Sequence, residues 1–269
     1  MYRGFNIVVV VPAGRKRYLE LQLPHVLKNR DIIDEYRYWV NTTIDGDLEY
    51  MKHNSELYSG FVTLDIEDIK TMTSFNIYKF FKRTVDQNTI YVRLDDDIVW
   101  MEKDSIKNLL DFRIDHPEYF LVYGNIINNT ICDNIHQRLG VYNNVEKIID
   151  YDCIGNGWAD PPLAIVKHKT FFANLKNGDA KRYKFNMWRL HSYERVSINC
   201  ISWFGSEFAS FDGNVGGDEE LWLACEKPKE MKKPNCICGS ALFSHFAYYV
   251  QREEVDKTDI LKTYSSLIL

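Results

Sequence analysis

From residue 1 to residue 125, the chain alternates between short apolar runs and longer stretches in which apolar residues recur every three or four positions. Residues 5–11 form a continuous β-branched run, which predicts a buried strand, and the spacing of leucine and valine over 19–27 predicts a helix after it. The same patterns predict further strands at 36–41, 60–64, 89–94 and 120–125, and helices at 75–83 and 106–113. Strands that alternate with helices are typical of an α/β fold with a mostly parallel sheet flanked by helices.

The pattern changes beyond residue 128. Residues 128–160 are rich in Asn, Asp and Gly without a sustained period, and an apolar run at 163–166 predicts a strand, followed by a helix at 168–175. Aromatic residues are scattered over 183–217, and a helix is predicted to begin near Asp218. Because no linker or repeat separates the two parts, we expect a single domain with halves at 1–127 and 128–269.

Three consecutive carboxylates, Asp95, Asp96 and Asp97, lie between the apolar runs 89–94 and 98–101, at the end of a predicted strand. Like charges this close repel one another, and burying them costs free energy unless a positive charge compensates. A divalent cation such as Mn²⁺ or Mg²⁺ binds oxygen ligands and keeps positions open for phosphate oxygens. In open α/β sheets, ligands bind beyond the carboxyl ends of the strands. The triplet therefore predicts a metal site, the alternative being a solvated turn.

The overall composition excludes several classes of protein. The 33 Lys and Arg residues are balanced by 38 Asp and Glu residues, a net charge of −5, and no basic block is present, which argues against nucleic-acid binding. No stretch has the length and apolarity of a membrane span or the pattern of a signal peptide. The six cysteines lack a framework spacing, so we expect free thiols. These features favour a soluble cytoplasmic protein.

A strand that ends in Asp-x-Asp resembles the signature of GT-A glycosyltransferases, which hold Mn²⁺ or Mg²⁺ against a nucleotide-sugar diphosphate. The run from Ile7 to Pro12 is similar to the first strand of that superfamily, and the end of the second strand, Trp39 to Thr42, resembles small glycosyltransferases of bacteria and of large DNA viruses of algae. The resemblance covers most of the chain in element order. It implies a GT-A-like fold with a nucleotide-sugar-binding half at 1–127 and an acceptor-binding, catalytic half at 128–269, located in the host cytoplasm if the protein is viral.

The resemblance also implies roles for individual residues. Asp97 would be the direct metal ligand, Asp95 would reach the ribose or the metal, and Asp96 would share either role. Arg93 would neutralise diphosphate charge, the alternative being an ordinary surface charge. The residues expected to line the base and ribose of a donor, UDP-linked by this reading, are Pro12, Ala13, Gly14, Arg15, Asn41 and Thr42.

A second acidic cluster, Asp218, Glu219 and Glu220, follows Gly216 and Gly217 and precedes an apolar helical pattern. Acids at the start of a helix can simply cap its free N–H groups. A carboxylate beside flexible glycines can also act as a general base, because a substrate can approach closely there. The cluster resembles the acid-bearing segment of inverting GT-A enzymes, which implies Asp218, and next Glu219, as the base.

Two further features belong to the candidate site. His245 lies among aromatic residues and would be a further metal ligand, since GT-A enzymes often supply a late histidine and imidazole suits Mn²⁺; the alternative is a structural histidine. Trp158, Trp203 and Asp160 would lie on the acceptor side, because sugars stack their apolar faces on aromatic rings. The alternative for these residues is ordinary packing.

The leading hypothesis is therefore a metal-dependent glycosyltransferase that moves a sugar from a nucleotide-diphosphate donor to a glycan acceptor with inversion. Alternatives are a sugar-nucleotide pyrophosphorylase or metal phosphoesterase, for which 13–16 offers only a short basic loop, and a non-catalytic carbohydrate-binding protein that uses the 17 Tyr, 15 Phe and 6 Trp residues. The glycine motifs of dinucleotide-binding Rossmann enzymes and P-loop NTPases are absent from the sequence, which disfavours both classes.

Overall fold

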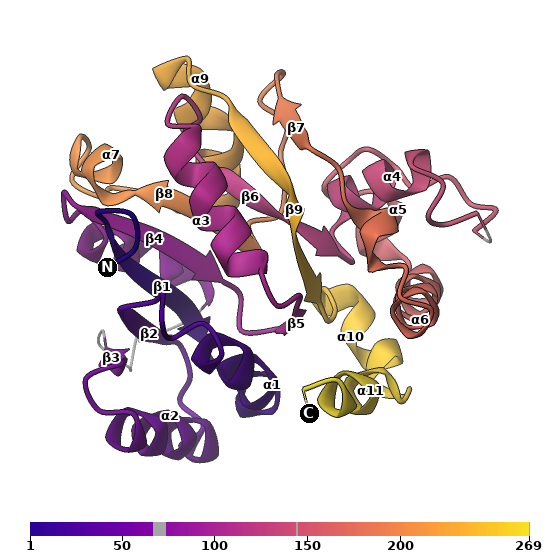
Figure 1. Ribbon diagram of the computed structural model, residues 1–269, viewed down its shortest axis with the longest axis horizontal. Coiled ribbons are helices and arrows are strands. Elements are labelled where there is room, and N and C mark those ends of the chain that lie inside the picture. Colours follow the sequence, from indigo (N-terminus) through magenta and orange to yellow (C-terminus); the bar gives the residue numbers. More distant parts are fainter. Residues whose placement is uncertain (67–73, 144, 269) are drawn as a thin grey trace.

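The computed structural model describes residues 1–66, 74–143 and 145–268, and a mixed sheet of nine strands forms its centre (Figure 1). The strands are β1 (Asn6–Ala13), β2 (Glu35–Val40), β3 (Val62–Asp65), β4 (Thr89–Leu94), β5 (Ile98–Met101), β6 (Val122–Ile127), β7 (Met187–Leu190), β8 (Cys200–Phe204) and β9 (Asn235–His245). Their order across the sheet is β3-β2-β1-β4-β8-β6-β9-β5, and β7 pairs with β9 beside this path.

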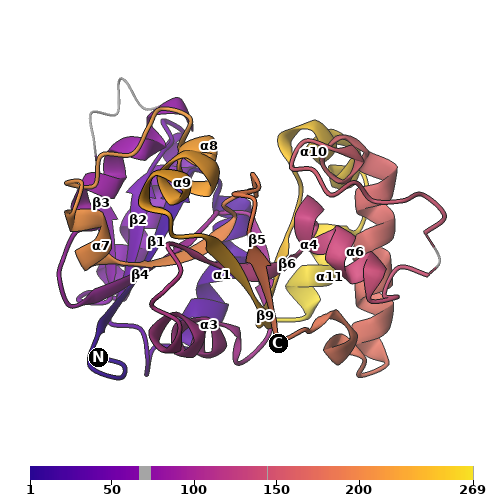
Figure 2. The same ribbon diagram turned by 90° about the horizontal axis from the view of Figure 1, so that it is seen from above.

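Helices flank the sheet and gather beyond its β9 and β5 side. The α-helices are α1 (Lys16–Leu27), α2 (Asp45–Leu57), α3 (Ser105–Asp115), α4 (Thr130–Arg138), α5 (Asn156–Ala159), α6 (Pro161–Lys176), α7 (Gly205–Ala209), α8 (Glu219–Leu221), α9 (Lys227–Met231), α10 (Tyr249–Asp256) and α11 (Ile260–Ser266). Short 3₁₀ helices are η2 (Ser74–Arg83) and η3 (Ala180–Tyr183), and η4 (Trp222–Glu226) is a π-helical turn. Figures 1 and 2 show α4, α6, α10 and α11 together on one side of the sheet.

The first half of the sheet follows the predicted pattern. Strands β3, β2, β1 and β4 pair in parallel, and β1 lies between two neighbours, so the run from Ile7 to Val11 is buried along its whole length. A continuous apolar run rather than an alternating one is what a strand covered on both faces requires. The predicted α/β class, with a mostly parallel central sheet flanked by helices, is confirmed.

The second half of the sheet departs from a purely parallel arrangement. Strand β8 pairs antiparallel with both β4 and β6, and β5 and β7 pair antiparallel with β9, while β6 and β9 are parallel. The predicted strand at 163–166 is wrong, because these residues belong to α6. The Asp160 side chain accepts a hydrogen bond from the Leu163 N–H at 3.0 Å, and Pro161 and Pro162 occupy the first helical positions. This helix-start signal outweighs a short apolar run.

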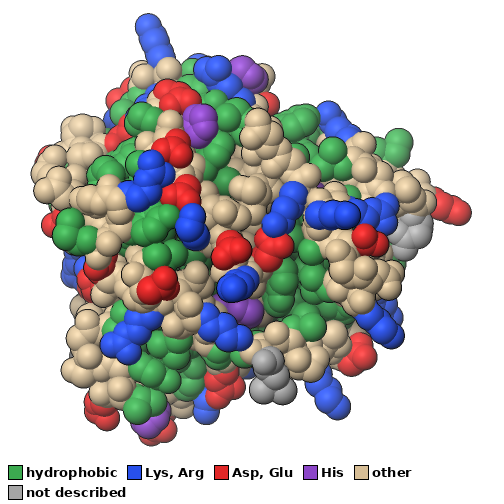
Figure 3. Space-filling view, in the orientation of Figure 1, with side chains coloured by type: hydrophobic (Ala, Val, Ile, Leu, Met, Phe, Trp, Pro, Cys, Tyr) green, Lys and Arg blue, Asp and Glu red, His purple; other side chains and the backbone are tan. Residues whose placement is uncertain are grey.

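Surface charge and thiols agree with the composition. Figure 3 shows Lys and Arg interspersed with Asp and Glu over one face, without a broad region of one sign. All six cysteines lie in the described part of the chain and are free thiols, as expected. Within residues 1–66, 74–143 and 145–268, no helix combines the length and apolarity needed to cross a membrane.

Candidate functional site

Strand pairing brings the acidic triplet next to residues far away in the sequence. Asp95, Asp96 and Asp97 occupy the link between β4 and β5, and β4 lies beside β1, whose end leads into Arg15. On the other side, β5 pairs with β9 so that Ile98 lies opposite His245, which places His245 beside Asp97. The triplet, Arg15 and His245 therefore meet at the carboxyl ends of strands, the edge at which α/β sheets bind ligands.

Each carboxylate of the triplet has a different set of partners. Asp96 accepts hydrogen bonds from Arg15 Nε at 3.0 and 3.1 Å and from the Gly14 N–H at 3.1 Å. Asp97 Oδ2 accepts from Arg15 at 2.9 Å, and Asp97 Oδ1 lies 3.4 Å from His245 Nε2. Asp95 accepts from Arg93 at 2.9 Å and from the Asn199 amide at 3.1 Å. Arginine thus compensates the repulsion that the sequence predicted.

The backbone at Gly14 explains why glycine follows β1. A Cβ atom there would lie 2.9 Å from the carbonyl oxygen of Asn41, closer than a side chain tolerates. The resulting close approach of the two strand ends lets the Gly14 N–H reach Asp96 and directs Arg15 toward the triplet.

Burial and charge act in opposite directions on Asp97. Its side chain is 4% exposed, and burial would raise the pKa of the carboxyl, but Arg15 and the other positive groups around it lower the pKa more, to well below its usual range. Asp97 is therefore ionised at neutral pH. An ionised, buried oxygen donor next to an imidazole nitrogen is a pair that suits a divalent transition-metal cation.

Two cavities share the triplet. The larger, about 790 Å³, lies at the ends of β1, β2 and β4. Its lining includes Pro12, Gly14, Arg15, Asn41, Ile77, Arg93, Asp95, Asp96, Tyr249 and Arg252. The smaller, about 270 Å³, is lined by Asp97 and His245 and by Cys153, Trp158, Ser197, Asn199, Glu220 and Tyr248, among others. Because Arg15, Asp95, Tyr249 and Arg252 line both, the two cavities adjoin at the triplet.

The three acids at 218–220 point in different directions. Asp218 is the N-cap of α8, where it accepts from the Leu221 N–H at 3.1 Å, and its half-exposed side chain pairs with Arg195. Glu219 accepts from Arg93 at 2.9 Å, and burial raises its pKa despite that charge. Glu220 also pairs with Arg195, at 2.8 Å, and is the member of the trio whose side chain lines the smaller cavity.

Most of the residues expected around a donor line the larger cavity, with two exceptions. Pro12, Gly14 and Asn41 line it, whereas Ala13 is completely buried. Thr42 is also buried, and its hydroxyl accepts from the Ile44 N–H at 3.1 Å at the start of α2. The backbone on either side of Ala13 therefore contributes to the cavity, while Thr42 serves the local turn.

The expected acceptor-side residues separate into three environments. Trp158 lines the smaller cavity and packs edge-on against Tyr249, with ring centroids 5.5 Å apart. Asp160 caps α6 and pairs with Lys147. Trp203 is completely buried on β8, stacked against Tyr91 at 5.7 Å, so no acceptor can contact it and the expectation for this residue is wrong. A tryptophan in a strand that pairs on both sides serves the core.

Several residues of the site carried no signal in the sequence. Arg252 on α10 reaches Asp97 Oδ2 at 3.4 Å across 155 positions of sequence, and Asn199 reaches Asp95 across 104. Both depend on pairing between distant segments. The position of Asn199 next to Asp95 could be predicted only if β8 were known to run antiparallel beside β4, where Leu94 lies opposite Cys200.

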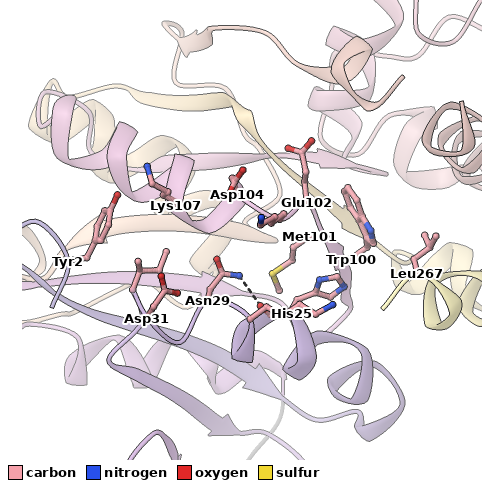
Figure 4. Close-up of a pocket in the computed structure, with 13 residues that line it drawn as sticks. Tyr2, His25, Asn29, Asp31, Trp100, Met101, Glu102, Asp104, Lys107 and Leu267 are labelled. Atoms are coloured by element: carbon pink, nitrogen blue, oxygen red, sulfur yellow. Dashed lines mark hydrogen bonds between the residues drawn. The ribbon is translucent and has the colours of Figure 1, made fainter. Parts of the chain in front are cut away.

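A third cavity of about 760 Å³ lies apart from the triplet, between α1, β5 and α3 (Figure 4). Figure 4 shows His25, Asn29, Trp100, Glu102 and Lys107 around it. Its lining mixes acids, lysines and apolar side chains, and among the described residues it includes none of the predicted site residues.

Comparisons with known proteins give the fold a context. The chain matches no protein-family profile, and no curated protein matches it in sequence. It is similar to the crystal structure of 4-diphosphocytidyl-2C-methyl-D-erythritol synthase from Anaerococcus prevotii, with a TM-score of 0.50, 11% identity and coverage of 98% of this chain and 99% of that one.

Two other solved structures have the same architecture. The mannosyltransferase PcManGT from Pyrobaculum calidifontis, in complex with GDP-Man and Mn²⁺, matches with a TM-score of 0.53 and 13% identity over 91% of this chain and 57% of that one. CMP:2-keto-3-deoxy-manno-octonic acid synthetase complexed with CTP matches with a TM-score of 0.50 and 8% identity over 97% and 99%. At these identities the likeness shows a shared GT-A-like, Rossmann-type fold.

Proposed function

We propose that the protein is a metal-dependent glycosyltransferase that transfers a sugar from a nucleotide-diphosphate donor, UDP-linked in the first instance, to a glycan acceptor. The observation that carries this proposal is the position of the Asp97–His245 pair. It lies where a cavity at the ends of β1, β2 and β4 adjoins a second cavity that contains an aromatic ring and a carboxylate. A transfer reaction needs such adjoining donor and acceptor spaces.

The side chains where the two cavities adjoin offer ligand atoms that suit a divalent cation. Asp97 offers an ionised oxygen and His245 a nitrogen, and Asp95 lines the same cavity. Within the described residues no group of three such side chains is already assembled, so diphosphate and water oxygens would complete the coordination. When bound, the cation would stabilise negative charge on the departing diphosphate.

The remaining residues of the site have complementary roles in the proposal. Arg15 and Arg252 line both cavities and would bind the diphosphate, releasing part of their hold on the triplet. Trp158 would stack on the acceptor sugar. Glu220 would accept the proton of the acceptor hydroxyl while the oxygen of that hydroxyl bonds to the anomeric carbon of the donor sugar. The bond between the anomeric carbon and the diphosphate would break at the same time, and its electron pair would leave with the diphosphate.

A second candidate, nucleotidyl transfer from a nucleoside triphosphate to a sugar or sugar phosphate, is favoured by one observation. Arg15 lies in the turn directly after β1 and reaches the triplet, so it could contact a triphosphate. Among the solved structures described above, one is a 4-diphosphocytidyl-2C-methyl-D-erythritol synthase and another is a synthetase complexed with CTP.

The test separates the two reactions by their products. Binding of UDP, GDP and CDP is first measured by calorimetry with and without Mn²⁺. Sugar nucleotides are then assayed for release of nucleoside diphosphate, and CTP or UTP with sugar phosphates for release of pyrophosphate. Metal-dependent binding with diphosphate release supports glycosyl transfer, pyrophosphate release supports the second candidate, and absence of nucleotide binding contradicts both.

The assignment of the base has its own matched set of variants. Glu220→Gln keeps the shape of the side chain and removes the proton acceptor, so we expect turnover to fall by about 10²-fold or more with donor binding unchanged. Asp218→Asn retains an N-cap and should leave turnover nearly unchanged. If Asp218→Asn or Glu219→Gln shows the larger loss, the base is not Glu220.

A further inference from the structure

His245 has contacts on both ring nitrogens. Nδ1 lies 3.1 Å from the backbone carbonyl oxygen of Asn128, and Nε2 lies 3.4 Å from Asp97 Oδ1. A carbonyl oxygen can only accept, so this hydrogen bond requires the proton on Nδ1. In the neutral form of the ring, Nε2 then carries no proton and its lone pair is directed toward Asp97. The competing tautomer, with the proton on Nε2, would bond to Asp97 and leave the Asn128 carbonyl without its partner.

The direction of the Asn128 carbonyl depends on an uncommon backbone conformation. Asn128 follows β6 directly and has φ +61°, in the left-handed region, with its side chain completely buried. Asparagine tolerates this region better than other residues with a side chain, whereas β-branched residues do not. The Asn128 amide donates to the carbonyl oxygen of Phe246 at 3.2 Å and to Gln251 Oε1 at 3.0 Å, which ties this turn to the segment that follows His245.

A buried ion pair holds the same turn from the other side. The Asn128 N–H donates to Asp133 Oδ1 at 3.1 Å, and Asp133 Oδ2 accepts from Lys167 at 2.7 Å, with both charged side chains completely buried. Lys167 also donates to the carbonyl oxygen of Gly157 at 3.1 Å, as does Gln251 at 2.8 Å. The contacts close a ring of hydrogen bonds through Asn128, and a ring with so many bonds has little freedom to turn the Asn128 carbonyl away.

We propose that Asn128 is a positioning residue that fixes His245 in the tautomer with the proton on Nδ1, so that Nε2 and Asp97 form a preformed half-site for a cation. The Asp133–Lys167 pair acts through Asn128 by anchoring its backbone. The cation in this statement rests on the proposed function, whereas the tautomer is a property of the protein alone. Outer contacts of this kind orient histidine ligands and change metal affinity by about 10–100-fold.

The first experiment reads the tautomer in the metal-free, nucleotide-free protein. Long-range ¹H–¹⁵N correlation spectra of the ¹⁵N-histidine-labelled chain are recorded at alkaline pH, with the His245 signals assigned by their loss in His245→Gln. We expect the proton on Nδ1. A neutral His245 with the proton on Nε2 overturns the inference. This readout needs no substrate, so it decides the inference even where the nucleotide-binding assays refute the proposed function.

The second experiment compares two variants of Asn128. Asn128→Gly loses the two hydrogen bonds of the amide but can keep the left-handed backbone and the N–H bond to Asp133, so we expect the Nδ1 proton to persist and the Mn²⁺ dissociation constant to change by less than about 3-fold. Asn128→Val disfavours that backbone, and we expect a shift toward the Nε2 tautomer and about 10–100-fold weaker Mn²⁺ binding. Equal effects of the two variants on tautomer and affinity contradict the positioning role. If Asn128→Val does not fold, the wild-type tautomer and Asn128→Gly still decide the question.

Discussion

The two sides of the molecule bury charge in different ways. Around β1 and β4, the buried charged residues Arg93, Asp96 and Asp97 lie at the rim where strands end and line the two cavities. Around α6, Asp133 and Lys167 lie deep in the protein and contact each other. Buried charge at a rim is available to a ligand, whereas a fully enclosed pair can only hold the shape of what surrounds it. Both sides of the molecule bear the desolvation cost of buried charge. On one side these charges are available for binding a ligand, and on the other they fix the local structure.

The largest effect is expected for Lys167→Met, which tests whether the enclosed Asp133–Lys167 pair stabilises the fold. Removing the ammonium leaves the buried Asp133 carboxylate without its lysine, while the neutral Asn128 N–H and Tyr142 hydroxyl still donate to it, so we expect the free energy of unfolding to fall by about 3–5 kcal/mol in chemical denaturation. Combining it with Asp133→Asn removes the unpaired charge and should recover part of the loss. If the single variant costs less than about 1 kcal/mol, the pair does not have the structural role assigned to it.

Asp97→Asn tests the rim in the same way. The change keeps the size of the side chain but removes its charge, so we expect metal-dependent turnover to fall on the order of 10²–10³-fold, because charge stabilisation at the reacting phosphate is lost. Because the ionised carboxylate bonds to Arg15, the change should also lower the unfolding free energy, but by less than Lys167→Met, since Arg15 keeps Asp96 as a partner. Nearly normal turnover in the presence of Mn²⁺ would contradict the metal role of Asp97.

The pH dependence of stability sharpens the comparison, because each side buries a neutral histidine. Burial lowers the pKa of His25 to about 4 and that of His168 to about 3, below the value near 6.5 expected in the unfolded chain. Their contribution to stability is therefore complete above pH 6.5 and is lost as pH falls toward the folded values, by about 2 kcal/mol for each residue between pH 6.5 and 5. Unfolding free energies measured over this range should fall less steeply in His25→Gln and in His168→Gln.

Two tryptophans give the smallest contrast. Trp158→Ala should raise the acceptor KM by about 10-fold through lost stacking and leave stability nearly unchanged, because the ring lines a cavity. Trp203→Phe should do the reverse, lowering stability by about 1–2 kcal/mol through imperfect packing while the KM stays the same. Steady-state kinetics and thermal melts of the same two preparations provide the comparison. A raised acceptor KM in Trp203→Phe would contradict the core role of Trp203 and support a contact with the acceptor.

The first strand and the strand before the triplet could be predicted because their apolar runs are continuous. The triplet could be placed at a strand end for the same reason. The direction in which each side chain points within a run of similar residues could not be predicted. At 218–220 the three acidic side chains diverge because successive helical positions are rotated by about 100°. Asp218 caps, Glu219 meets Arg93 and Glu220 faces the cavity, and no spacing rule ranks them.

The role of Trp203 was mistaken for a similar reason. An aromatic residue among serines and glycines has the same local pattern whether it lines a cavity or packs in a sheet. Only the pairing of β8 with both β4 and β6 shows that its surroundings are filled. Arg252 was missed because it depends on the chain returning to Asp97 after 155 positions.

The wide sequence spacing around Asp97 has a consequence for biosynthesis. Arg15 is made 82 positions before it, but Arg252 is made 155 positions after it, and His245 only shortly before Arg252. Until residues 235–252 have left the ribosome, β5 has no β9 to pair with, and Asp97 lacks both His245 and Arg252 as neighbours. A partly synthesised chain that has not yet reached β9 would therefore expose the acidic triplet beside an unpaired β5, so the charges that the folded protein holds in a cavity would face water during synthesis.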